Sequence, residues 1–228
     1  MTVQNGMRAV GLGLAATLVA PASGSVVTQT NARTGFFDSS SGTREVAFNV
    51  LQFADSPVIT DIDLSVSFAK SNDNSFVAQG EDVSSGTPFL NEIEFVLTSP
   101  GGTSFTLISN DGDTEIVAAD DFETFENGAD GFSGTIVFDQ DAAEPVDLTA
   151  DLLTAGTFRP DDDTEGSLDL FNGESALGTW TFFIEDDVGS DGLSFYAFTL
   201  TVTTVPEPAS LAILGFAGLG LLKRRRDG

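Results

Sequence analysis

Two residues on which much enzyme chemistry depends are missing, because the 228 residues of the chain include no cysteine and no histidine. Without cysteine the chain can form neither a disulfide nor a thiolate site. Without histidine it cannot build a Ser-His-Asp or Cys-His catalytic arrangement, and the usual zinc ligand sets are excluded too. We therefore expect a protein that is not an enzyme of these kinds.

Positive charge is scarce, and most of it lies at the two ends of the chain. Residues 23–208 hold 4 basic and 34 acidic residues, a net charge of 4 − 34 = −30. A domain this acidic is repelled by nucleic acid phosphates and by anionic lipid, so we expect no nucleic acid partner. The acids can form a solvated surface that keeps an extracellular protein soluble, or carboxylate clusters that bind Ca²⁺.

Long stretches of helical periodicity are absent before Pro208, and short alternating runs take their place. In residues 61–68, four apolar residues alternate with aspartate and serine, which is typical of a half-buried strand. Residues 195–202 alternate in the same way, after an acidic loop with glycines at 185–192. Short strands with glycine-rich turns predict an all-β, antiparallel β-sandwich. Twenty Phe against one Trp suggest that Phe fills its core.

Several short motifs resemble, in their order, the P domain (P/Homo B) that follows the catalytic domain of subtilisin-like proprotein convertases. The motifs are LTSPGGT at 97–103, FRP at 158–160, LFNGES at 170–175 and GTW at 178–180. The resemblance implies a jelly-roll-like sandwich and an association with serine-type endopeptidases. The chain departs from the family at Phe198, where the family usually has Trp, and in a polar insert at 70–91.

The N-terminus is typical of a secretory signal peptide over residues 1–22. Arg8 is its lone positive charge, an apolar run follows at 9–20, and residues 20–22 have the small-x-small form of a cleavage site. Residues 23–44, rich in Ser, Thr, Gly and Asn, are expected to form a loose lead-in. The sandwich domain is then expected to occupy residues 45–204.

The tail, residues 205–228, has three parts in a fixed order. The motif Pro-Glu-Pro is followed by an uncharged apolar run at 209–222 and then by four cations. This order resembles the PEP-CTERM sorting signal of Gram-negative and related envelope proteins. The resemblance implies an exosortase, a membrane cysteine transpeptidase, as the partner that processes the tail. The residues of the motif are Pro206, Glu207, Pro208, Lys223, Arg224, Arg225 and Arg226.

The apolar run of the tail is short for a membrane helix. Its fourteen residues reach about 21 Å as a helix, whereas the hydrocarbon core of a bilayer is roughly 30 Å thick. The four cations would hold the C-terminus in the cytoplasm. We expect a transient anchor in the inner membrane that is processed during export, and an ordinary short tail anchor is the alternative.

Two acidic loops are candidates for a Ca²⁺ site. The first places carboxylates at alternate positions with Gly166 at position six, as in the first half of an EF-hand-like loop. Its twelfth position is Asn172 rather than Glu, so an acidic surface turn is the alternative. The second is the loop before the last strand. The candidate ligands are Asp161, Asp163, Glu165, Asp169, Asp187 and Asp191.

One enzyme motif occurs in the chain, and the expected secondary structure argues against it. Ser67 and Lys70 match the S-x-x-K of penicillin-binding enzymes. They lie in an expected strand, whereas that chemistry uses the start of a helix, and no K-T-G follows.

Trp180 leads another expected strand, so we expect it in the core with Phe182, beside Phe198 or Leu200.

Two functions are compatible with these features. The first is an exported, non-enzymatic β-sandwich of the cell envelope, cell surface or exopolysaccharide matrix, stabilised by Ca²⁺, with a binding or structural task. The second is an accessory P domain that assists an exported subtilisin-like serine protease. Retention on extracellular polysaccharide would favour the first function, and co-purification of an exported protease would favour the second.

Overall fold

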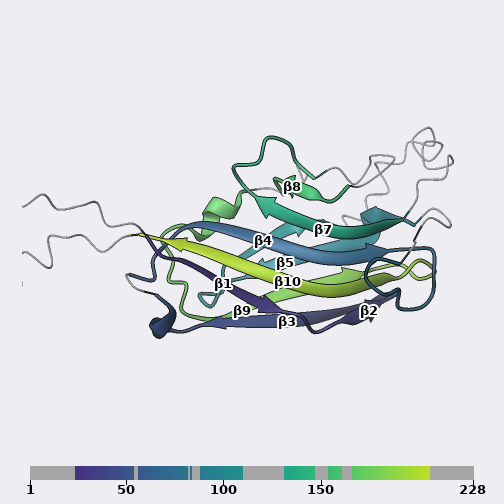
Figure 1. Cartoon of the computed structure of the whole chain (residues 1–228), viewed down its shortest axis with the longest axis horizontal. Helices are drawn as coiled ribbons and strands as arrows, with labels where there is room; N and C mark the ends of the chain where they lie inside the picture. Colours follow the sequence, from purple (N-terminus) through teal and green to yellow (C-terminus); the bar gives the residue numbers. More distant parts are fainter. Residues whose placement is uncertain are drawn as a thin grey trace, which may run out of the picture. The chain divides into compact units, whose positions relative to one another are not determined.

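The structure is a computed structural model that describes residues 24–53, 56–81, 83, 88–109, 131–146, 154–160 and 166–205. Gly24–Pro206 forms one compact unit (Figure 1). The predicted signal peptide and almost all of the tail lie outside the described residues, as do Asp161, Asp163 and Glu165. The described strands are β1 (Val26–Asn31), β2 (Gly35–Phe37), β3 (Ser40–Phe48), β4 (Ile59–Lys70), β5 (Ile93–Thr98), β6 (Ser104–Ile108), β7 (Phe132–Asp139), β8 (Gly156–Phe158), β9 (Gly178–Asp186) and β10 (Leu193–Thr204). Three short 3₁₀ helices accompany them, η1 (Val50–Gln52), η2 (Leu90–Glu92) and η4 (Leu168–Phe171).

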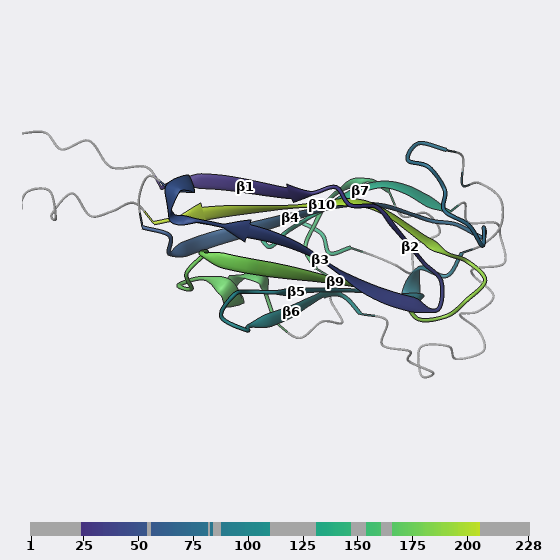
Figure 2. The same cartoon turned by 90° about the horizontal axis from the view of Figure 1, so that it is seen from below.

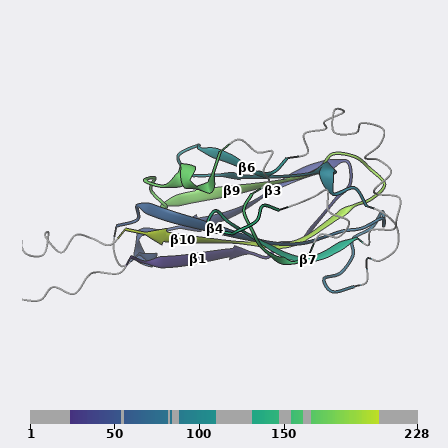
Figure 3. The ribbon, with the colours of Figure 1, turned by 90° about the horizontal axis from the view of Figure 1, so that it is seen from above.

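The strands form two sheets that lie on each other as layers (Figures 2 and 3). The six-stranded sheet has the order β1-β10-β4-β7-β8, and β2 also pairs with β10. The four-stranded sheet has the order β3-β9-β5-β6. Among the described strands the pairs are antiparallel, apart from β7 with β8. The predicted all-β, antiparallel sandwich is confirmed.

Alternation along each strand decides which residues enter the core. In β4, Ile62, Leu64, Val66 and Phe68 are buried, while the residues between them are half-exposed on the outer face. β5 and β9 bury every second residue in the same way, and so does β10 from Phe198 onward. The buried faces of both sheets join in one apolar cluster. This burial of apolar area is the main favourable term in folding.

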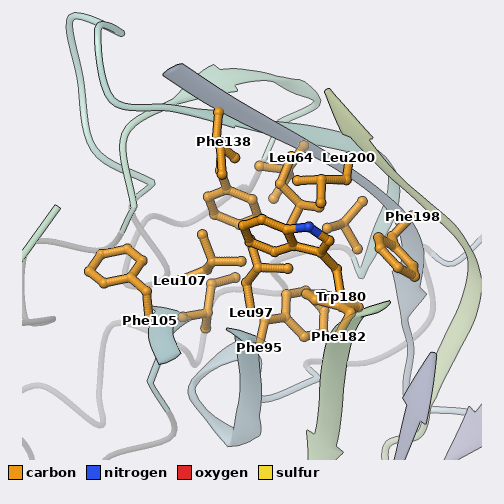
Figure 4. Packing of buried hydrophobic residues seen from close by; sticks show 14 of the residues in the cluster. Leu64, Phe95, Leu97, Phe105, Leu107, Phe138, Trp180, Phe182, Phe198 and Leu200 are labelled. Carbon is orange, nitrogen blue, oxygen red and sulfur yellow. The ribbon is translucent and has the colours of Figure 1, made fainter. Parts of the chain in front are cut away.

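Trp180 lies in the core, as predicted from its strand (Figure 4). Its indole Nε1 donates a hydrogen bond to the carbonyl of Ala176 at 3.0 Å, so burial leaves no unsatisfied donor. Its ring makes an edge contact with Phe171, with 5.2 Å between ring centroids. Phe182 is also buried, and its ring centroid lies 5.0 Å from that of Phe198. Phe198 thus fills with a smaller ring a position where the P-domain family usually has Trp.

The prediction of a loose lead-in over residues 23–44 is wrong. β1 and β2 both pair with β10, and β3 pairs with β9. Hydroxyls bridge the first of these pairs, at 3.2 Å between Thr28 and Thr201 and at 2.9 Å between Thr30 and Thr199. The partner strand lies 173 residues further along the chain at the first bridge. Local composition cannot reveal so distant a partner, and the sandwich therefore begins at β1.

Candidate functional site

Asp169 lies apart from the other described members of the predicted calcium set. It is exposed in η4, where its carboxylate accepts hydrogen bonds from Ser167 Oγ at 3.1 Å and from Asn172 Nδ2 at 2.9 Å. The following loop binds the start of β4, since the Gly173 N–H donates to the Ile59 carbonyl at 2.9 Å. Its partners in the predicted EF-hand-like loop lie outside the described residues, so the hypothesis for that loop stays a prediction.

Asp187 and Asp191 share the loop between β9 and β10 but have different surroundings. Asp187 is exposed, and its backbone N–H donates to the Glu92 carbonyl at 3.1 Å. Asp191 is buried, and one of its carboxylate oxygens accepts from the Phe89 N–H at 2.5 Å. The structure therefore does not unite the two as ligands. Nor does it bring together, within the ranges it describes, three or more acidic side chains spaced to hold a metal ion.

Asp191 belongs instead to a cluster around Lys70, the last residue of β4, whose side chain is fully buried. The ammonium Nζ lies 3.0 and 2.9 Å from the two carboxylate oxygens of Asp186. It lies 3.1 Å from Glu92 and 3.4 Å from the Asp191 carboxylate, and it also donates to the Asp191 carbonyl. We call Lys70, Glu92, Asp186 and Asp191 the Lys70 cluster. It ties together β4, η2, the end of β9 and the loop before β10.

Charge in the Lys70 cluster is unequal, because one ammonium faces three carboxylates. Burial raises the pKa of Glu92 to about 7 and that of Asp186 to about 6. Lys70 opposes both increases, and the negative charge of Asp191 adds to them. Proton uptake by an acid relieves the excess negative charge. The Lys70 ammonium is the cation that neutralises part of the negative charge of the three carboxylates. The cluster is therefore an ionic crosslink between segments that are distant in the sequence.

The strand geometry separates the two residues of the S-x-x-K motif. Ser67 and Lys70 are three positions apart on β4, so they point to opposite faces of the sheet. Ser67 Oγ lies 2.6 Å from Thr135 Oγ1 on the outer face, whereas Lys70 enters the sandwich. A lysine placed in this way cannot activate that serine. The sequence pattern did not reveal the role of Lys70. Lys70 lies two residues after buried Phe68, however, and therefore faces the same side of the strand.

A second group of acids lies on the outer face of the six-stranded sheet. Asp63 of β4 stands directly opposite Asp139 of β7. The pKa of Asp63 is raised to about 6, mainly by partial burial. The negative charges of Asp61, Asp139 and Asp141 contribute smaller increases. These side chains are at least partly exposed, so the surrounding water screens their repulsion. The group gives this face a strong local negative charge.

The motifs that carry the P-domain resemblance meet in space. Thr103, at the end of LTSPGGT, donates its hydroxyl to the Glu174 carboxylate of LFNGES. Gly178, the first residue of GTW, has a φ of +121° and approaches Pro100 so closely that an added Cβ would lie 2.7 Å from its ring. Only glycine suits both conditions. These residues pack and shape turns, which explains their identity without a bound ligand.

The two ends of the compact unit leave the sandwich together. The Thr204 N–H donates to the Ser25 carbonyl, and the Val205 N–H donates to the Val58 carbonyl, both at 2.9 Å. We call this the terminal end, and the end that holds the Lys70 cluster is the Lys70 end.

Within the described ranges, no helix is long and apolar enough to cross a membrane.

Comparison with known proteins bears on the tail most directly. Residues 204–226 match the model of the PEP-CTERM protein-sorting motif, which confirms the resemblance of the tail. The motif marks an exported protein that is handled at the cell envelope, and it implies processing by an exosortase. The search of curated proteins gave no match.

Two solved structures are similar to most of the chain. One is the complex of the Aeromonas sobria serine protease (ASP) with the chaperone ORF2, at 14% identity and a TM-score of 0.39. The other is the serine protease of Aeromonas sobria, at 15% identity and a TM-score of 0.37. Each similarity covers 79% of this chain and 27% of the other, so the chain spans about a quarter of their length. The P-domain resemblance itself rests on the motifs.

Proposed function

We propose that the protein is an exported β-sandwich that its tail delivers to the cell envelope, where the sandwich remains as a binding or structural module. One observation carries the proposal. β10 ends at Thr204, and the sorting motif begins at the same residue. Within the described residues, Thr204 and Val205 are the last positions of the chain that donate backbone hydrogen bonds to the sandwich. A cut near Pro208 would leave every described strand ladder intact.

Removal of the tail can be tested in the native host. The mature protein should lack residues 1–22 and 209–228, which intact-mass measurement would show directly. A mature C-terminus still at Gly228, in a host that has an exosortase, would mean a permanent anchor and would overturn the sorting proposal. A mass that also lost residues before Thr204 would contradict the inference that the sandwich stays whole.

The task of the delivered sandwich is proposed to be binding or structural rather than catalytic. Support comes from the missing histidine and cysteine and from the separation of Ser67 and Lys70 on opposite faces of β4. Extracellular polysaccharide is the proposed ligand class, because the domain is too acidic for nucleic acid or anionic lipid. Retention of the sandwich on exopolysaccharide of the host, but not on a neutral resin, would support this. Free passage through both would contradict it.

A second function, as an accessory domain of an exported serine protease, has one observation in its favour. The LTSPGGT and LFNGES motifs contact each other through Thr103 and Glu174, as expected if they define one family fold rather than coincide by chance. Co-purification of an exported serine protease from the host would support the accessory role. Purification of the sandwich without a protease, from cells that secrete one, would contradict it.

A further inference from the structure

The turn η1 presents apolar side chains to water in a fixed conformation. Leu51 is 93% exposed and Val50 is 63% exposed. Asn49 caps the turn, because its side chain accepts from the Leu51 N–H at 3.0 Å while its own N–H donates to Gln52 Oε1 at 2.6 Å. Phe53 anchors the turn from below, with its ring centroid 6.0 Å from that of Phe48. We call Val50 and Leu51 the apolar tip.

The apolar tip lies at the terminal end of the sandwich. β3 ends at Phe48 just before the turn, and Val58, shortly after it, binds the backbone of Val205. Figures 1 and 2 both show this turn at the end where β1 begins and β10 stops. Val26, 65% exposed, pairs with Thr203 at the same end. Single exposed apolar residues are ordinary, but Val50 and Leu51 are adjacent and are two of the six large ones on the described surface.

We propose that the apolar tip contacts the lipid surface while the tail is inserted in the membrane. The inference rests on the proposed function and on the expectation that the run 209–222 is a transient anchor in the inner membrane. Val205 is four residues from Ala209, a span of at most about 14 Å. An inserted run therefore keeps the terminal end close to the interface. Apolar side chains gain free energy by leaving water there.

Charge explains why the contact is limited to the tip. Residues 49–53 carry no charge, so they enter the interface without desolvating an ion. The rest of the domain is strongly acidic and is repelled by anionic headgroups. The tip thus suits a zwitterionic surface, against which it sets the orientation of the sandwich. The tail would stop at its cations, and the tip would hold the residues before Ala209 at a defined height for processing.

The absence of native cysteine allows a direct test. Leu51→Cys and, as a matched control at the Lys70 end, Val188→Cys each give a single labelling site; Val188 is 49% exposed in the loop between β9 and β10. Each chain without the signal segment 1–22, labelled with an environment-sensitive dye, is reconstituted in phosphatidylcholine vesicles with and without brominated lipid. We expect a blue shift and loss of emission at position 51, and neither change at position 188.

The test separates this inference from the proposed function. Flotation of the labelled chain with the vesicles reports the inserted tail, and the dye reports the tip. Flotation without quenching at position 51, or equal quenching at both positions, would overturn the tip contact and leave the tail in place. Failure of the chain to float would overturn both. In the double variant Leu211→Asp/Leu214→Asp, which breaks the apolar run of the tail, quenching at position 51 should be lost, and its persistence would contradict the dependence on the tail.

Discussion

The two ends of the sandwich differ in what they bury and what they expose. At the Lys70 end an ammonium and three carboxylates lie inside, where four segments of the chain meet. At the terminal end Val50, Leu51 and Val26 lie outside, where the chain leaves the fold. The Lys70 end thus departs from the usual rule that charged groups lie outside, whereas the terminal end presents the apolar tip to water. The buried charges crosslink the domain, whereas the side chains of Val50 and Leu51 are open to contact with another surface.

The largest expected effect is at the Lys70 end. Lys70→Met removes the one cation of the cluster and leaves two buried carboxylates and the partly buried Glu92 without it, so the free energy of unfolding should fall by about 3–5 kcal/mol. Urea unfolding followed by the fluorescence of Trp180 would measure it. For comparison with the apolar core, Trp180→Ala should lower the free energy of unfolding by about 3–5 kcal/mol, as measured by circular dichroism. A Lys70→Met protein as stable as the native one would show that the cluster is no crosslink.

The next effect concerns calcium and tests the two acidic loops that the sequence predicts as candidate sites. Ca²⁺ bound only to the native state would raise the melting temperature, and at a hundredfold excess over Kd it would add about 2.7 kcal/mol. The triple variant Asp161→Asn/Asp163→Asn/Glu165→Gln should lose this increase, whereas Asp187→Asn should keep it. NaCl of equal ionic strength is the control, because it only screens the surface charge. If NaCl reproduces the whole increase, no specific calcium site exists.

A smaller effect follows from the raised pKa values at the Lys70 end. Glu92 has an ordinary pKa of 4.5 and a pKa of about 7 in the folded protein, so the native state holds a proton that the unfolded state has lost. Stability from this group is full below pH 4.5 and is lost as pH rises through about 7. Glu92→Gln should flatten that decline in melting temperature, while the exposed control Glu45→Gln should not. An unchanged decline in Glu92→Gln would contradict the assignment.

The smallest effect is expected at the terminal end. Leu51→Ser removes a side chain that is almost fully exposed and packs on nothing in the domain. The free energy of unfolding should change by no more than about 0.5 kcal/mol, as for other surface substitutions. Urea unfolding under the conditions used for Lys70→Met makes the two ends directly comparable. A loss above about 1 kcal/mol would show that the tip supports the fold, as a buried core residue does.

Local pattern was sufficient for several features of the protein. The alternation in β4 and β10 predicts an all-β fold, because successive side chains of a strand face the buried and the exposed side of a sheet in turn. The lead position of Trp180 in β9 placed it in the core. The order of Pro206, the apolar run and Lys223 identified the sorting motif. The position of Lys70, two residues after buried Phe68, also predicts an inward side chain. The role of a lone cation on an apolar face can be inferred only once its partners are known.

Only the tertiary structure decided which distant residues meet. Residues 26–31 are polar enough for a loop, and they become a strand because β10 offers a free edge at the far end of the sequence. Asp191 lies near Asp187 in sequence, yet it pairs with Lys70, which lies more than a hundred residues earlier. The same closure brings Ser25 and Val205 to one end beside the apolar tip. Periodicity is a property of neighbouring residues, whereas strand pairing depends on the whole chain. The sequence pattern therefore determined the strongly alternating strands, and the fold determined β1 and the sites.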